Sequence, residues 1–172
     1  MRNLFFVLLA VGTTACQPNT TRPGITPYPE ALGGELRLSV SETTRHLAEL
    51  LKADSIPVSQ VRLRDGYIET RWFDSRTGRA KKGRTALGPQ TVRIRGWADP
   101  ARPGSTQLTV ETVYRPLADP SLPERELERQ VPADHPTARK VGAMIGRLVT
   151  RYGAPPPPQP QKPRNEAAPD SD

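Results

Sequence analysis

Apolar residues recur with two different periods in the middle of this chain, and the order of those periods constrains its fold more than any other feature. Five segments alternate apolar with polar residues, which is typical of strands with one buried face: residues 34–40, 58–64, 67–74, 90–99 and 105–116. Asp65-Gly66 joins the second segment to the third, and this dipeptide is a strong hairpin signal. The sequence therefore predicts an antiparallel sheet.

Two further segments, residues 39–54 and 134–153, follow the helical period instead. Ser39 and Glu42 have the spacing of a capping box at the start of the first helix, and Ser41 is an equally good cap. The predicted buried stripes consist of Val40, Thr44, Leu47 and Leu51 in the first helix, and of Ala138, Val141, Ile145, Leu148 and Tyr152 in the second.

The order strand, helix, three or four strands, helix predicts an α+β fold. We expect a two-layer sandwich in which two helices cover one face of a four- to five-stranded antiparallel sheet. The other face of such a sheet is expected to lie in water. Alternation places Arg93, Arg95 and Trp97 on this solvent face, whereas Trp72 is expected in the core because it continues the alternation of the strand before it.

Segments rich in proline and glycine bound this domain on both sides. Residues 17–34 have no sustained apolar period, and residues 153–172 have four consecutive prolines near their start and hold no large apolar side chain. We therefore predict a tether over 16–34, one domain over 35–153 and a disordered Pro-rich tail over 154–172. The tail is interpreted as a spacer, with a ligand for a proline-binding partner as the alternative.

Cys16 is the only cysteine of the chain, and it follows a basic residue, an apolar run over residues 4–11 and four small residues. That order is typical of a secretory signal peptide, and the run is too short for a spanning helix. With Ala15 before it, Cys16 resembles the lipobox cysteine of bacterial lipoproteins, which prefer Leu or Val where Thr13 stands. An ordinary secreted protein and a cytosolic domain with a free thiol are the alternatives.

The lipoprotein resemblance implies that residues 1–15 are removed and that acyl chains such as palmitate on Cys16 hold the protein in the cell envelope. Gln17 follows the cysteine, and in enterobacterial lipoproteins that pattern implies the outer membrane, facing the periplasm, in preference to the inner membrane. The element order is also similar to the helix-grip module of the C-component lipoprotein of the outer-membrane β-barrel assembly machine. The resemblance implies an accessory protein that binds an envelope protein partner in outer-membrane assembly or maintenance.

The sequence carries no motif for catalysis. His46 and His135 are far apart, and neither stands at a ligand spacing from thiols or carboxylates. Nucleophile-elbow, zinc-protease and P-loop patterns are missing from the sequence. We therefore predict a non-enzymatic protein without catalytic residues, metal, cofactor or small-molecule substrate, in which both histidines are solvated.

Positive charge is the remaining feature that indicates binding, since the 25 Lys and Arg residues outnumber the 18 Asp and Glu residues. Residues 75–90, called here the basic segment, hold five of these cations and no acidic residue, whereas residues 118–130 lean acidic. The predicted anionic-partner surface comprises Arg71, Arg79, Lys81, Lys82, Arg84, Arg93, Arg95, Trp97 and Arg115. Phospholipid or lipopolysaccharide head groups would be its ligand in the alternative function, and nucleic acid is not expected for an envelope protein. The other interpretation of the basic segment is a solvated run of charge.

Overall fold

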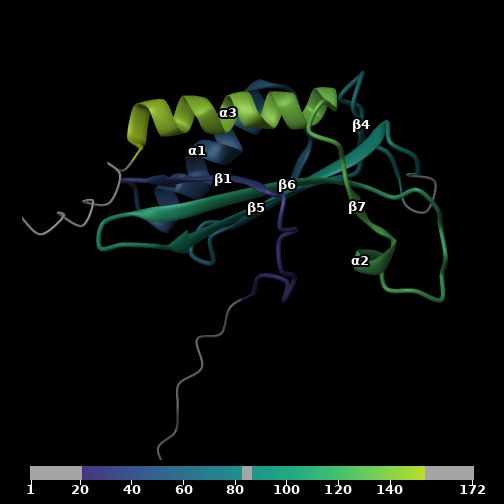
Figure 1. The fold of residues 1–172 in the computed structure, drawn as a ribbon, viewed down its shortest axis with the longest axis horizontal. Coiled ribbons are helices and arrows are strands. Elements are labelled where there is room, and N and C mark those ends of the chain that lie inside the picture. Colours follow the sequence, from purple (N-terminus) through teal and green to yellow (C-terminus); the bar gives the residue numbers. More distant parts are fainter. Residues whose placement is uncertain (1–20, 83–86, 154–172) are drawn as a thin grey trace, which may run out of the picture.

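The computed structural model describes residues 21–82 and 87–153, which form an α+β fold with two long helices on one face of an antiparallel sheet (Figure 1). The predicted two-layer fold class is confirmed. The strands are β1 (Leu32–Leu36), β2 (Val58–Arg62), β3 (Tyr67–Thr70), β4 (Phe73–Asp74), β5 (Thr91–Pro100), β6 (Thr106–Tyr114) and β7 (Arg129–Gln130). The helices are α1 (Val40–Ala53), α2 (Glu124–Leu127) and α3 (Pro136–Tyr152).

The sheet follows the order β1-β6-β5-β3-β2, and the short strands β4 and β7 pair with β5 and β6 beside this path. The long β5–β6 hairpin is its centre, in register from Val92 opposite Tyr114 to Pro100 opposite Thr106. The hairpin predicted at Asp65-Gly66 is confirmed, since β2 and β3 pair in antiparallel fashion. Sequence alternation did not separate β4 and β7 from their neighbours.

The core lies between the helices and one face of the sheet. In α1 the predicted capping box is formed, and Thr44, Leu47 and Leu51 are buried as expected. In α3 the buried stripe also includes Met144, which was not predicted. Gly96 on β5 allows α1 to approach closely, because a Cβ atom there would lie 2.7 Å from side-chain carbons of both Leu47 and Ile68. This close contact fixes α1 over β3 and β5.

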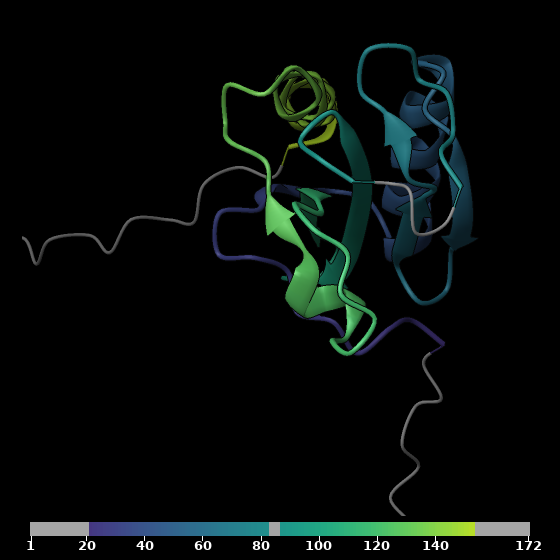
Figure 2. The ribbon, with the colours of Figure 1, turned by 90° about the vertical axis from the view of Figure 1, so that its right-hand side faces the viewer.

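The opposite face of the sheet is covered in part, which corrects the prediction that it lies in water. Residues 21–31, called here the strap, cross this face, and α2 lies on the same side (Figure 1). Figure 2 looks along α3 and shows α2 below the sheet while α3 lies above it. Part of the segment predicted as a tether is thus packed on the sheet, because Tyr28 donates its backbone N–H to Glu111 (3.1 Å). Polar residues can alternate on this face because they pair with one another under this cover.

No helix among the described residues has the length and apolar character needed to cross a membrane. Cys16 and residues 154–172 lie outside the described residues, and so does Arg84.

Candidate functional site

Arg95 stands at the centre of the covered face, on β5 between β3 and β6. Its guanidinium donates two short hydrogen bonds to Glu128, at 2.6 and 2.7 Å. The same group reaches Glu69 at 3.1 Å and Glu111 at 3.2 Å. Burial opposes the charge of Arg95, but its hydrogen bonds to Glu128 and the nearby carboxylates raise its pKa above the ordinary value. Arg95, predicted as a binding-surface residue, is therefore internal, with an exposed fraction of 3%.

Arg125 on α2 connects this group to the strap. It donates to Glu111 at 2.6 Å, and it donates to the backbone carbonyl of Thr26 at 2.6 Å. Its guanidinium also lies 3.9 Å from the centre of the Tyr28 ring, a cation–π distance. The strap is thus held to the sheet through the same carboxylates that hold Arg95.

Trp72 lies against two arginines at one end of the covered face. The guanidinium carbons of Arg93 and Arg115 lie 4.5 and 4.7 Å from the centre of its ring. We call these three residues the clamp. Trp72 is buried as predicted, with an exposed fraction of 4%, but it packs with Val113 and Tyr28 in a small second cluster on this face and not in the main core. The reason is that β3 ends at Thr70 and the chain resumes pairing at Phe73, whose side chain enters the main core instead.

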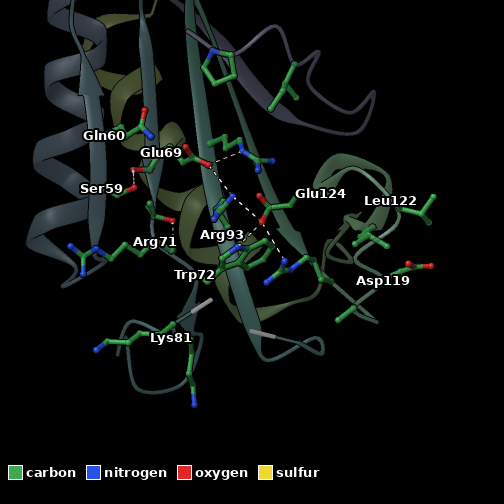
Figure 3. Close-up of a pocket in the computed structure, with 18 of the residues that line it drawn as sticks. Ser59, Gln60, Glu69, Arg71, Trp72, Lys81, Arg93, Asp119, Leu122 and Glu124 are labelled. Carbon is green, nitrogen blue, oxygen red and sulfur yellow. Dashed lines mark hydrogen bonds and ion pairs between the residues drawn. The ribbon is translucent and has the colours of Figure 1, made fainter. Parts of the chain in front are cut away.

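All three members of the clamp contact the same oxygen atom of Glu124 (Figure 3). The Trp72 indole N–H donates to Glu124 Oε1 at 3.0 Å, and Nη1 atoms of Arg93 and Arg115 each lie 3.4 Å from the same atom. Burial raises the pKa of Glu124, but Arg93 and the other donors outweigh it and hold the pKa below the usual range. Glu124 is nevertheless about half exposed, with a side-chain exposed fraction of 45%.

The clamp forms part of a hollow of about 960 Å³ on this face. Ser59 and Gln60 line it from β2, and the loop before α2 contributes an apolar wall that includes Pro120 and Leu122 (Figure 3). The exposed side chains of Arg71, Lys81 and Lys82 form its cationic rim. The hollow therefore combines an apolar wall, an aromatic ring and arginines. The arginines at its floor form ion pairs with carboxylates.

The structure brings most of the predicted binding residues together, but it divides them into two groups, the arginines of the floor and the cations of the rim. Arg93, Arg95 and Arg115 line the floor of the hollow with Glu69 and Glu124. Their ion-pair network continues outside this lining to Arg125, Glu111 and Glu128. Four cations meet four anions in this network, so the network as a whole carries no net charge. Its predicted attraction for anions is therefore much reduced.

Of the basic segment, Lys81 and Lys82 line the hollow, whereas Arg79 is exposed beside it. Lys81 Nζ lies 3.9 Å from a carboxylate oxygen of Asp74.

Trp97 is not a surface aromatic, which corrects its predicted role. Its exposed fraction is 2%, and its ring meets Tyr67 edge-on at a centroid distance of 5.8 Å. Alternation placed Trp97 correctly on the arginine face. The strap then covers that face, which alternation does not reveal.

Sequence reasoning missed the roles of Trp72, Glu124 and Glu128. The signal that could have found the two glutamates is the acidic character of residues 118–130 opposite an arginine-bearing strand. Charge complementarity between two segments far apart in the chain predicts that they pack against each other.

A second cavity of about 650 Å³ lies between the strap, β6, β7 and the first half of α3. Its lining is mostly apolar and includes Leu32, Val110 and Ala138. The two histidines lie elsewhere. His46 stacks on Tyr152, and His135 accepts a hydrogen bond from the backbone of Thr137 at the start of α3.

Within residues 21–82 and 87–153, no three His, Cys, Asp or Glu side chains are grouped in a way that could hold a metal ion. A scan against protein-family models found no family that matches this chain, and a search of curated proteins found no relative.

Proposed function

We propose that this chain is a non-enzymatic accessory lipoprotein of a bacterial cell envelope, and that it binds an envelope protein partner in the hollow. The lipobox-like sequence at Cys16 supports the anchor. Acyl chains on that residue would hold the protein at the outer membrane, facing the periplasm, in a role in the assembly or maintenance of that membrane.

The observation that carries the binding proposal is the composition of the hollow. The arginines of its floor are paired with carboxylates, its wall is apolar at Pro120 and Leu122, and its rim is cationic at Arg71, Lys81 and Lys82. Protein interfaces combine an apolar and aromatic centre with a polar rim, and they are enriched in Trp and Arg. A volume of about 960 Å³ is enough for several side chains of a partner.

Site-specific photocrosslinking in cells that make the full chain tests this proposal. A photoreactive residue replaces Gln60, which is exposed and lines the hollow, and a matched control replaces Lys140, which is exposed on α3. We expect the first position to yield a crosslinked protein of one discrete mass from the membrane fraction and the second to yield none. Equal crosslinking from both positions, or crosslinks to lipid alone, would contradict a protein-binding hollow.

The second candidate function is binding of anionic lipid head groups through the basic segment. The observation in its favour is that Arg79, Lys81 and Lys82 are all exposed on the short stretch that follows β4. Each cation close to an anionic membrane surface contributes about 1 kcal/mol. Crosslinking at Gln60 separates the two candidates, because head-group binding predicts no discrete protein product.

A further inference from the structure

We infer that the clamp is a carboxylate-binding site, that Glu124 occupies it in the isolated protein, and that an acidic side chain of a peptide partner replaces Glu124 there. This inference rests on the proposed function, since it names the chemistry of the partner that enters the hollow. The arrangement that carries it is the convergence of three donors from three segments of the chain on one oxygen of Glu124.

The clamp has the composition of a built anion site. Trp72 supplies an N–H donor, and the two arginines supply donors that cannot lose their charge at physiological pH. The indole ring lies against both guanidinium groups, at 4.5 and 4.7 Å, and this stacking orients them toward the same point. Because the group now bound there is the side-chain carboxylate of a glutamate, an acidic side chain is the ligand whose geometry the clamp already accepts.

Glu124 differs from the other carboxylates of this face in how easily it can leave. Glu111 and Glu128 are fully buried, whereas the side chain of Glu124 is 45% exposed. It stands at the first position of α2, a helix of four residues whose N-cap, Pro123, makes no side-chain hydrogen bond. Displacement of Glu124 therefore disrupts little regular structure.

The arginines remain oriented when Glu124 leaves. Arg93 keeps its contact with Glu69 at 3.1 Å, and both arginines keep their stacking on Trp72. The cationic rim of Arg71, Lys81 and Lys82 then favours a ligand that carries more than one acidic residue. An acidic peptide is the occupant that satisfies both the clamp and the rim.

The test measures binding of a fluorescein-labelled peptide of six glutamates to the full chain, made soluble by Cys16→Ser, by fluorescence anisotropy at low salt. Wild type is compared with Glu124→Gln, and the matched control is Glu126→Gln, which removes the same charge from an exposed neighbour on α2. We expect Glu124→Gln to bind the peptide about tenfold more tightly, as for a site that is otherwise open about a tenth of the time. Glu126→Gln should bind like wild type.

Equal affinities for wild type and Glu124→Gln, or the same gain from Glu126→Gln, would overturn the inference. The inference would also be overturned if Glu124→Gln bound inorganic phosphate, or vesicles with roughly 30% anionic lipid, more tightly than the peptide. That result would indicate a phosphate or membrane site. Thermal melting checks that each variant is folded. If Glu124→Gln does not fold, Glu124→Asp, which shortens the tethered carboxylate, should still bind the peptide more tightly than wild type.

Trp72→Phe in the Glu124→Gln background gives a reading that a general charge effect would not. It removes the indole N–H but keeps an aromatic ring between the arginines, and we expect it to abolish most of the gain in peptide affinity. An unchanged gain would exclude Trp72 as a donor. This assay needs neither a lipid anchor nor a natural partner, so its failure is distinguishable from a failure of the crosslinking test.

Discussion

Replacement of Arg95 by Met tests whether the charges under the strap stabilise the fold as one group. Arg95→Met removes the guanidinium but keeps most of the apolar stem. Glu111 would keep Arg125 at 2.6 Å, and Glu69 would keep Arg93 at 3.1 Å. Glu128 would lose its contacts at 2.6 and 2.7 Å and keep only Arg125 at 3.3 Å.

The variant therefore leaves essentially one buried carboxylate without its main partner. Breaking a buried ion pair in this way costs about 3–5 kcal/mol. A domain of ordinary stability has about 5–15 kcal/mol in total, so the loss is a large part of it. Arg95→Lys keeps the charge but cannot make the two-point contact with Glu128, and we expect its loss of unfolding free energy to lie between those of wild type and Arg95→Met.

Urea unfolding of the full chain carrying Cys16→Ser measures this cost. With a slope of about 1–3 kcal/mol/M, the midpoint for Arg95→Met should fall by about 1 M or more. The matched control is Arg102→Met, which breaks the half-exposed pair of Arg102 with Glu35 and should change the midpoint far less.

Adding Glu128→Gln to Arg95→Met should recover part of the loss, because no buried charge then remains without its partner. A loss below about 1 kcal/mol for Arg95→Met, or strict additivity in the double variant, would refute the view that these charges act as one buried group.

The remaining predictions concern the core, the anchor and the basic segment. Ile145→Ala should lower the unfolding free energy by about 2–5 kcal/mol, whereas deletion of residues 155–172 should leave the melting temperature unchanged; a large drop on deletion would contradict the domain boundary. Cys16→Ser should give unprocessed precursor or a soluble protein, and mass spectrometry of the wild-type mature N-terminus should show acyl mass on Cys16. Under the head-group alternative, we change four cations of the basic segment to Gln: Arg79, Lys81, Lys82 and Arg84. The fold should stay intact, and cosedimentation with anionic vesicles should weaken more at low salt than at high salt. Equal binding by the variant and wild type would indicate that the segment is a solvated run of charge.

Local pattern was sufficient for the two long helices, the main strands and the fold class, but not for the short elements β4, α2 and β7. Strand and helix periods depend on which neighbours in the sequence share a face, so the α1 and α3 stripes and the β2–β3 hairpin follow from short segments. The capping box of Ser39 and Glu42 spans three residues and is likewise local. The same local reasoning placed Arg93, Arg95 and Trp97 on one face of β5, where the structure also has them.

The sequence by itself thus determined which residues share a face, but only the tertiary structure decided what covers that face. Arg95 meets Glu128 across 33 residues of chain, and Arg125 meets the strap at Thr26 across 99. No periodicity encodes such pairs, because a charged residue has the same place in an alternating pattern whether water or a distant carboxylate solvates it. The convergence of Trp72, Arg93 and Arg115 on Glu124 has the same origin. Residues from separate segments of the chain meet there because burying charge is tolerable only where opposite charges compensate it.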